Sequence, residues 1–410
     1  MKATAPARYI PRSLEPVLKR AAREFPVVVL TGPRQSGKTT LLKHLFGARY
    51  RYVCLEPPDV RAAAVADPRG FLAMYSPPAI FDEVQYVPQI LPYIKEGVDA
   101  HRDRAGQYLL TGSQNLLVLE RVSESLAGRA AVLRLLPLSC REITGRPGAA
   151  LRWESGKRGS GPRLSHKGLW ESLLRGGYPE LAANPKRDAA LWHAGYVQTY
   201  LERDVRTLRQ IGDLTQFQIL LRALAARNAQ LLNLAELSRE LGIAVNTVKA
   251  WLSVLEATFQ IIVLRPYFAN IGKRLVKTPK VYFTDTGTLC HLAGLKAPEH
   301  AASGPMGGAI LETAVVSEIV KGYWNRGAEP QIYFWRTSTG AEVDVLVETE
   351  GRLVPIEVKL SATPSPSMAR GIEVFRKDLG RRAAKGYVVH PGDIQLPLGP
   401  DAMALPFAEL

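Results

Sequence analysis

The residues whose spacing most clearly suggests chemistry form a short glycine-rich stretch that ends in a lysine and a threonine. Gly32 and Gly37 are separated by four residues, and Lys38 and Thr39 follow immediately. The glycines let successive backbone N–H groups face a polyphosphate at the positive end of the next helix. Lys38 would neutralise the β- and γ-phosphates, and Thr39 would offer its hydroxyl to Mg²⁺. The stretch predicts a nucleotide-binding loop made of Gly32, Pro33, Arg34, Gln35, Ser36, Gly37, Lys38, Thr39 and Thr40.

Two adjacent carboxylates follow a later apolar run. Ala79, Ile80 and Phe81 would form a short strand, so that Asp82 and Glu83 would stand at the carboxyl edge of a sheet. There Asp82 would hold Mg²⁺ through water, and Glu83 would orient and deprotonate an attacking water. Without further context, such a pair is a solvated strand end as often as it is a functional site. Its place after a phosphate loop predicts nucleotide hydrolysis, and we expect its strand to pair with the strand before the loop.

Two further groups could act near a γ-phosphate. Ser113 and Gln114 form the polar tip of another apolar run and would sense the γ-phosphate, although a turn or helix cap explains them equally well. Arg129 could be an arginine finger that reaches its own nucleotide or that of a neighbouring subunit. A simple surface arginine is the alternative.

A second candidate site lies in the last quarter of the chain. Glu312 begins an expected amphipathic helix, Asp344 lies in a β-branched run, and Glu357 and Lys359 alternate around Val358 on a third element. Carboxylates on adjacent strands would bind Mg²⁺, which lowers the pKa of a water, and the lysine would position that water or steady developing charge. Glu312 would orient or complete the metal shell. The pattern predicts phosphodiester cleavage, but alternating charges can also be a solvated strand face.

A helix-turn-helix pattern precedes that site. Residues 235–241 and 246–255 have helical periodicity and are joined by a turn at Gly242, and two strand-like segments, 260–264 and 281–283, would form a wing. The residues expected to meet DNA are Thr247, Lys249 and Ser253 on the second helix and, on phosphates, Lys273, Arg274, Lys277 and Lys280 of the wing. Such units also serve as protein-binding modules or ATPase lids.

The overall composition limits the class of protein. At 410 residues, two to four domains are expected. The net charge of +15 favours a polyanionic partner, although a merely soluble basic protein is the alternative. Three distant cysteines, Cys54, Cys140 and Cys290, form neither a disulfide framework nor a zinc cluster, which indicates a reducing, cytoplasmic compartment. We expect no signal peptide and no membrane span.

The elements that must position these residues alternate between strands and helices. Apolar runs near 27–31, 50–55, 79–81, 107–110 and 131–136 would be strands. A helical stretch at 9–25 leads into the first run and another at 60–73 follows the second, which predicts a parallel α/β sheet. Residues 145–168 are rich in Gly, Pro and basic side chains and predict a mobile linker without buried apolar surface. Strands at 332–335, 342–347 and 353–359, a last helix at 368–379 and a last strand at 385–390 would carry the second site.

The first third resembles the P-loop ATPases of the AAA superfamily, and specifically the bacterial and archaeal group that pairs an AAA-type ATPase with a domain of unknown function, DUF4143. The stretches that carry the resemblance are 30–40, 81–85, 110–113, 125–129 and 137–139. It implies ATP as the nucleotide and an ASCE-type sheet in which the catalytic strand lies between the phosphate-loop strand and its neighbour. Related ATPases often form rings, so the resemblance leaves a homo-oligomer or a ring open, and Arg129 would need one to act on a neighbouring subunit's nucleotide.

Two later stretches extend the resemblance. Residues 176–180 and 196–205 look like the second domain of that family, which implies a helical lid beside the nucleotide. Glu202, Arg203 and Asp204 within it are better explained as an ion-paired helix face than as catalytic groups. The order Glu312, Asp344, Glu357, Lys359 resembles the PD-(D/E)xK nuclease superfamily, whose members can keep the fold and bind without cleaving.

The sequence thus predicts an α/β protein: an ASCE parallel-sheet ATPase domain, a helical and winged-helix middle, and a restriction-endonuclease-like C-terminal domain. The expected boundaries are 1–145 for the ATPase, 146–168 for a basic linker, 169–225 for the lid, 226–300 for the winged helix and 301–410 for the nuclease-like domain. One hypothesis is a Mg²⁺-dependent ATPase that couples hydrolysis to DNA remodelling or nuclease-like processing. The other is an ATP-switched regulatory or scaffold protein with an inactive nuclease-like domain and protein partners.

Overall fold

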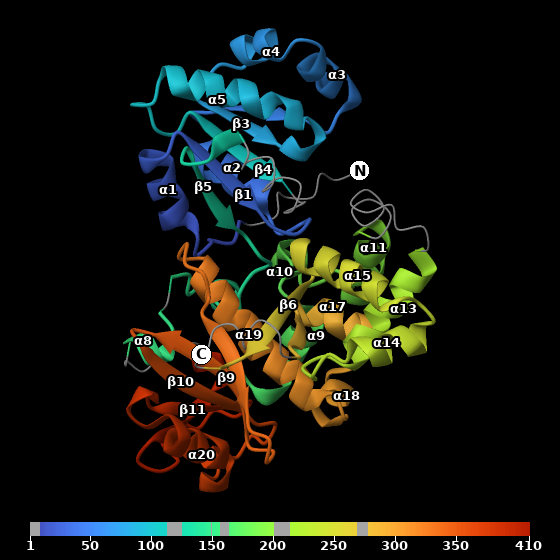
Figure 1. Ribbon diagram of the computed structural model, residues 1–410, viewed down its shortest axis with the longest axis vertical. Coiled ribbons are helices and arrows are strands. Elements are labelled where there is room, and N and C mark those ends of the chain that lie inside the picture. Colours follow the sequence, from blue (N-terminus) through green and yellow to red (C-terminus); the bar gives the residue numbers. More distant parts are fainter. Residues whose placement is uncertain (1–8, 113–124, 149, 156–163, 201–213, 269–277) are drawn as a thin grey trace.

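The described part of the chain folds around two separate β-sheets. The computed structural model describes residues 9–112, 125–148, 150–155, 164–200, 214–268 and 278–410. A five-stranded sheet forms the N-terminal unit, an eight-stranded sheet forms the C-terminal unit, and a group of helices lies beside both (Figure 1). No helix in these residues is long and apolar enough to cross a membrane.

All neighbouring strands of the N-terminal sheet are parallel, in the order β2-β3-β4-β1-β5. The strands are β1 (Val27–Thr31), β2 (Arg51–Cys54), β3 (Ala79–Asp82), β4 (Tyr108–Gly112) and β5 (Ala130–Arg134). Successive residues of β1 point to opposite faces, and both faces are covered. Val28 and Leu30 pack with Leu18 and Leu41 on one side, where α1 (Glu15–Glu24) and α2 (Lys38–Phe46) lie. The other side is covered by α3 (Pro58–Ala66), α4 (Pro68–Met74) and α5 (Leu91–Ala100).

The strand order corrects one expectation. The strand that carries Asp82 does not pair with β1: Tyr108 of β4 is paired with Val27 on one side and Ala79 on the other. The strand inserted beside β1 is therefore β4. Every residue of β4 is buried, which suits a central strand, but apolar periodicity alone does not determine the order of buried strands.

The helix expected over residues 60–73 is two helices. Asp67 ends α3, and its side chain accepts a hydrogen bond from the Gly70 N–H at 2.9 Å as the N-cap of α4. Pro68 lacks an N–H and cannot continue the first helix, so the chain starts a second one.

The C-terminal sheet has the order β12-β13-β11-β10-β9-β8-β6-β7. Its strands are β6 (Ile261–Pro266), β7 (Lys280–Phe283), β8 (Ile332–Arg336), β9 (Glu342–Thr349), β10 (Arg352–Val358), β11 (Gly386–His390), β12 (Leu396–Pro397) and β13 (Ala402–Pro406). The segment after 391, in which no pattern is apparent, supplies β12 and β13. The helix α19 (Gly307–Trp324) packs on one face, and α20 (Arg370–Leu379) packs on the other.

The sequence predicts that α19 is amphipathic, but the helix is buried on nearly every side. Its apolar side chains join one cluster with the β-sheet residues Val345 and Ile356 and with Leu255 of the helical unit. A helix packed between two layers buries both of its faces. This position holds Glu312 between the helical unit and the sheet.

The helical unit contains the expected helix-turn-helix. Helices α14 (Leu234–Leu241) and α15 (Val245–Ala257) are joined at Gly242, whose φ of +65° suits glycine. The antiparallel pair β6 and β7 follows, and β6 then pairs in parallel with β8, so the wing is the edge of the C-terminal sheet. The remaining helices are α7 (Cys140–Ile143), α8 (Arg152–Ser155), α9 (His166–Arg175), α10 (Pro179–Ala183), α11 (Ala189–Tyr200), α13 (Leu214–Ala226), α17 (Thr286–Leu292) and α18 (Pro298–Ser303).

Part of the predicted linker is packed. Leu151 is buried at 1% exposure, and Glu154 of α8 pairs with Arg326 after α19 at 2.5 Å. The expectation that 145–168 buries no apolar surface is therefore wrong for its first half. Its basic centre, 156–163, lies outside the described residues.

Candidate functional site

The phosphate loop joins β1 to α2, as the sequence predicts. Gly32 has φ +150°, and a Cβ there would lie 2.1 Å from the backbone oxygen of Leu135. Gly37 has φ +94° and caps α2 in a left-handed conformation, and Gln35 also has a positive φ of 60°. The loop can take this shape only because glycines occupy its two ends.

The polar groups of the loop fit a phosphate ligand. The Lys38 side chain is buried and donates to the carbonyl oxygens of Gly32 and Pro33, each at 2.9 Å. The Ser36 hydroxyl is buried and has no hydrogen-bond partner among the described residues. A buried ammonium and an unsatisfied hydroxyl at a helix N-terminus are the groups that an anion would satisfy.

Asp82 and Thr39 meet at the end of β3, in an arrangement that suits a hard cation. The Thr39 hydroxyl donates to the two carboxylate oxygens of Asp82 at 3.0 and 2.9 Å. Tyr52 donates to the same carboxylate at 2.7 Å, and the Thr111 hydroxyl does so as well. Carboxylate and hydroxyl oxygens are ligands of the kind that Mg²⁺ takes. No sequence pattern marks Tyr52 as the residue that supports them.

The backbone of Glu83 has an uncommon conformation that sets the direction of its side chain. Its φ of 59° and ψ of 49° are left-handed, which is uncommon for a non-glycine residue and typical of functional sites. The Glu83 N–H donates to the Thr111 hydroxyl at 3.1 Å, and the Gln85 amide donates to the Glu83 carboxylate. Thr111, at the tip of β4, thus contacts both acidic residues. Ser113 and Gln114 lie outside the described residues.

Of these groups, Lys38, Thr39 and Glu83 line a cavity of about 410 Å³. One wall is the loop with Lys38 and Thr39, and Glu83 faces the same space. The lining also includes Pro179, Glu180 and Ala183 of α10, which belong to the helical unit. Glu180 is held there by Trp192 at 2.9 Å and Arg187 at 2.8 Å.

Arg12 links the loop to the rest of the molecule, although it belongs to no motif in the sequence. Its guanidinium is buried and donates to the Ser36 carbonyl at 2.8 Å, to the Leu136 carbonyl at 2.7 Å and to the Glu142 carboxylate at 3.1 Å. Glu142 also closes a capping box with Ser139 at α7. A lone arginine before the first helix has no periodic pattern that would distinguish it from a surface residue.

Arg129 is not at its own nucleotide site. It precedes β5, and its carbonyl accepts from the Val27 N–H at the start of β1, whereas the phosphate loop follows the end of β1. Its side chain makes two hydrogen bonds to Asp99, at 2.7 and 2.9 Å, and these lower the pKa of Asp99 to about 2. The interpretation of Arg129 as a finger acting on its own nucleotide is therefore wrong for this structure.

The second candidate site brings its predicted residues together. Tyr333 pairs with Leu346 and Trp335 with Val343, so Phe334 stands opposite both Asp344 and Val345 in a bulge of β9. The Asp344 carboxylate accepts from the Val358 N–H at 2.8 Å. Lys359 donates to Glu357 at 2.5 Å, which confirms that these two side chains share a face. Asp344 lies close enough to Glu312 and Glu357 for its carboxylate to raise the pKa of both.

Two lysines neutralise this cluster. Burial and the Asp344 carboxylate raise the pKa of Glu312 to about 7, and the same two causes raise the pKa of Glu357 to about 7. Lys280 pairs with Glu312 at 3.2 Å and with Glu342 at 2.6 Å. Burial alone would lower the pKa of Lys280, but the surrounding carboxylates outweigh it and raise that pKa.

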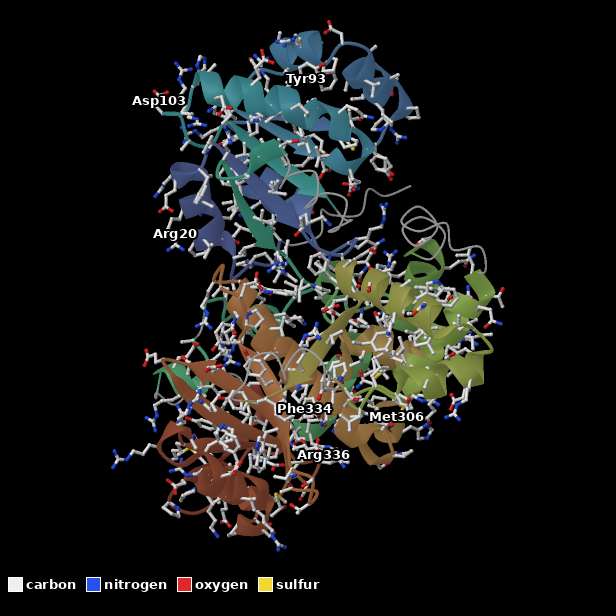
Figure 2. All side chains as sticks on the ribbon, in the orientation of Figure 1. Arg20, Tyr93, Asp103, Met306, Phe334 and Arg336 are labelled. Atoms are coloured by element: carbon white, nitrogen blue, oxygen red, sulfur yellow. The ribbon has the colours of Figure 1, made fainter. Side chains whose placement is uncertain are left out.

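The position of Lys280 corrects its expected role. Its side chain is 6% exposed and lies 5.6 Å from the ring centroid of Phe334, which is labelled in Figure 2, so it does not reach toward DNA. Tyr282, two residues later and fully buried, donates to Glu312 at 2.6 Å. Lys273, Arg274 and Lys277 lie outside the described residues, as do Glu202, Arg203 and Asp204.

In the described part of the chain, no group of three or more His, Cys, Asp or Glu side chains is arranged to hold a metal ion. Glu312 is bonded to Lys280 and Tyr282, and Glu357 is bonded to Lys359. The carboxylates therefore face cations supplied by the protein itself. A role for Glu312, Asp344 and Glu357 as metal ligands stays a prediction.

Replacing Gly32 with alanine is expected to lower the free energy of unfolding by about 1–3 kcal/mol and to weaken nucleotide binding, because the new Cβ would collide with the Leu135 oxygen and strain the loop. Thermal unfolding and titration with a fluorescent ATP analogue measure the two effects. The control is Gly308→Ala, a helical position where a Cβ meets nothing within 4 Å. Unchanged nucleotide affinity in Gly32→Ala would contradict the assigned loop.

Three family models match the chain. One described as AAA domain covers residues 24–144, one described as domain of unknown function (DUF8612) covers 166–299, and one described as domain of unknown function (DUF4143) covers 307–410. The uncharacterized proteins Rv2008c of Mycobacterium tuberculosis and Mb2031c of Mycobacterium bovis are each 34% identical over 393 residues, covering 95% of this chain and 82% of theirs. The Walker-type ATPase PABY2304 of Pyrococcus abyssi is 15% identical and aligns with a TM-score of 0.47 over 71% of this chain and 98% of its own.

Proposed function

Because the chain belongs to the family that joins an N-terminal AAA domain to a C-terminal DUF4143 domain, we propose that it hydrolyses Mg²⁺-ATP and uses the hydrolysis to act on DNA. The AAA-type P-loop ATPase domain is the part that implies ATP binding. The observation that carries the proposal is the cavity of about 410 Å³ that this domain shares with α10 of the helical unit. A ligand there would touch both units at once.

In this proposal the residues around the cavity have separate tasks. Lys38 and the backbone N–H groups of the loop bind and neutralise the phosphates. Thr39 and Asp82 would hold Mg²⁺, which supplies charge neutralisation at the phosphates when bound. Glu83 orients a water and accepts its proton. Thr111 holds Glu83 and Asp82 in position, because its hydroxyl is hydrogen-bonded to both residues.

The contacts of Arg12 support coupling to the rest of the chain. One side of its guanidinium holds the loop at the Ser36 carbonyl, and the other side holds Glu142 at the start of the connection to the helical unit. Beyond it, the Leu138 N–H donates to the Gly177 carbonyl at 2.7 Å, and Lys321 of α19 donates to the Leu138 carbonyl at 3.1 Å. These hydrogen bonds would therefore transmit a movement of the loop to α19, which carries Glu312.

The helix-turn-helix supports DNA as the partner. On α15, Val248, Trp251 and Leu252 are buried, whereas Lys249 and Ser253 are exposed on the opposite side. A second helix with a free polar face is the element that enters the major groove in such units. The net charge of +15 adds non-specific attraction to phosphates.

The test is ATP turnover with and without duplex DNA. Lys249→Gln is expected to weaken DNA binding most at low salt, to lower the slope of log affinity against log salt by about 1, and to reduce stimulation of ATP turnover by DNA, because one phosphate contact is lost. The control is Lys167→Gln, which removes an exposed lysine of α9 whose nearest acidic partner is Glu171 at 3.8 Å. ATP turnover that ignores DNA, together with DNA binding that ignores salt, would contradict the proposal.

The buried ion pairs of Lys280 favour a second candidate function. A site whose carboxylates are already neutralised by lysines suits an ATP-switched regulatory or scaffold protein with an inactive nuclease-like domain and protein partners. Incubation of linear and branched DNA with Mg²⁺ or Mn²⁺ distinguishes the two functions. Cleavage that is lost in Asp344→Ala supports nuclease-like processing, and intact DNA in every reaction supports the scaffold.

The compartment and the assembly belong to the same proposal. Cys54, Cys140 and Cys290 are free thiols, which supports a reducing cytoplasm. Action of Arg129 on a neighbouring subunit's nucleotide, in a homo-oligomer or ring, stays a prediction. It would require Arg129 to leave Asp99.

A further inference from the structure

A second hollow lies at the other edge of the N-terminal sheet. It has a volume of about 930 Å³. Its lining residues include Arg23, Tyr50, Pro78 and Gln107, which come shortly before β1, β2, β3 and β4. The phosphate loop follows the end of β1. The hollow therefore lies at the amino ends of the parallel strands, and the nucleotide cavity lies at their carboxyl ends.

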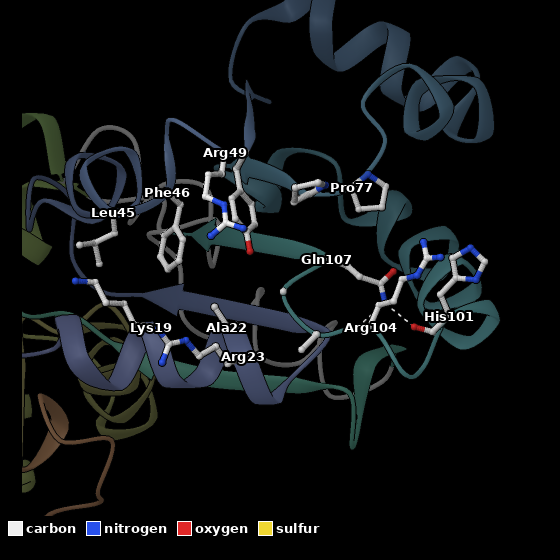
Figure 3. A pocket seen from close by; sticks show the side chains of 14 residues that line it. Lys19, Ala22, Arg23, Leu45, Phe46, Arg49, Pro77, His101, Arg104 and Gln107 are labelled. Carbon is white, nitrogen blue, oxygen red and sulfur yellow. Dashed lines mark hydrogen bonds between the residues drawn. The ribbon is translucent and has the colours of Figure 1, made fainter.

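The hollow is lined by cations and by no carboxylate. Figure 3 shows Lys19 and Arg23 along α1 on one side of it, and Arg49, Arg104 and His101 around the remainder. Within the described residues, none of the four Lys and Arg side chains forms an ion pair with a carboxylate. Like charges gathered around one hollow repel one another, and a bound polyanion would remove that repulsion.

The scaffold positions these cations. Gln107 is buried, and its amide donates to the carbonyl oxygens of His101 and Arg104, each at 2.9 Å, so the loop before β4 is held (Figure 3). The Gly106 N–H donates to the Phe25 carbonyl at 2.8 Å and ties that loop to the end of α1. The cations therefore stand on a fixed frame.

Aromatic rings lie among the cations. The half-buried rings of Phe46 and Tyr50 both line the hollow and meet edge to face, with centroids 5.3 Å apart. Cations that follow a phosphate backbone, interleaved with rings that accept bases, are the combination used for single-stranded nucleic acid. A paired base cannot reach a ring inside a hollow, whereas an unpaired base can.

We propose that this hollow, lined by Lys19, Arg23, Phe46, Arg49 and Arg104, binds a single strand of nucleic acid. The inference rests on the proposed function and deepens it, because it places an unpaired strand on the ATPase domain itself, at the edge away from the nucleotide. Duplex held by the helix-turn-helix and a displaced strand held here would then be two contacts of one substrate.

The test measures anisotropy of a labelled oligothymidylate with the full chain over a series of salt concentrations. Arg23→Gln and Arg49→Gln are each expected to weaken binding and to lower the slope of log affinity against log salt by about 0.7, the value for one phosphate contact on a single strand. Phe46→Leu is expected to weaken binding about fivefold or more, because a base loses its stacking partner. The matched control is Arg20→Gln, an exposed arginine of the same helix that does not line the hollow (Figure 2).

The outcomes separate this site from the proposed function. If the unaltered chain binds no nucleic acid, both fail. If Arg23→Gln and Arg49→Gln bind as the unaltered chain does while Lys249→Gln binds more weakly, only the hollow is wrongly assigned. If inorganic polyphosphate competes as well as the oligonucleotide and Phe46→Leu has no effect, the hollow binds phosphate without reading bases, and the inference is overturned.

Discussion

Replacing Glu83 with glutamine is expected to lower ATP turnover by about 10²–10⁴-fold, because glutamine keeps the shape of the side chain but cannot accept a proton from water. ATP binding should persist, since Lys38, Thr39 and the loop backbone are untouched. The left-handed backbone of Glu83 and the hydrogen bond from its N–H to Thr111 do not depend on the carboxylate, so the variant should keep the geometry of the site. Phosphate release and binding of a fluorescent ATP analogue measure the two properties.

The control for this prediction is Glu96→Gln. Glu96 lies in the same domain, on α5, where it is exposed and paired with Arg69 at 2.7 Å. The Glu96→Gln variant should turn over ATP as the unaltered protein does. Full turnover by Glu83→Gln would remove Glu83 as the general base, and loss of ATP binding in the same variant would show that the site had been disturbed rather than its chemistry.

Replacing Lys280 with methionine is expected to lower the free energy of unfolding by about 3–5 kcal/mol, because it leaves buried carboxylates without their cation. Lys280 is 6% exposed and pairs with Glu312 and Glu342, and the Asp344 carboxylate is close enough to raise its pKa. Denaturant unfolding followed by tryptophan fluorescence measures the change. The control is Arg352→Met, which removes an exposed cation from β10 of the same sheet and should cost little.

The same variant tests whether the carboxylates can take a metal. Without Lys280 the cluster gains one net negative charge, so Mn²⁺ should raise the melting temperature of Lys280→Met more than that of the unaltered protein. An equal effect of Mn²⁺ on both proteins would indicate that the cluster is an internal ion-pair network. A melting temperature that is unchanged by Lys280→Met would contradict the energetic role assigned to the pair.

The parts of the site that sequence analysis predicted are local in the chain. The loop from Gly32 to Thr39 and the pair Asp82 and Glu83 depend on glycine conformations and on short apolar strands, which neighbouring residues determine. The helix-turn-helix followed for the same reason, since Gly242 and the period of the flanking helices are local features. Glu357 and Lys359 shared a face because alternation along a strand has a period of two.

The parts that it missed depend on contacts between distant residues. Arg12 meets Glu142, and Lys280 meets Glu342, across separations that no periodicity records. The sequence allowed Arg129 to be an arginine finger. In the structure it precedes β5, at the amino ends of the parallel strands, whereas the phosphate loop lies at their carboxyl ends. A charge in a basic segment has the same appearance in the sequence whether it faces solvent or a buried acid.

By itself, the sequence determined that this protein has a phosphate loop, a pair of acidic residues after a strand, and a hairpin that carries Asp344 and Glu357, because each is a pattern within one or two elements. Only the tertiary structure decided that β4 separates β1 from β3, that α10 lines the cavity beside the phosphate loop and that Lys280 pairs with Glu312. The physical reason is that strand order, cavity walls and buried charge pairs arise from packing between elements. Packing depends on which surfaces meet, and the order of residues along the chain does not contain that information in any local form.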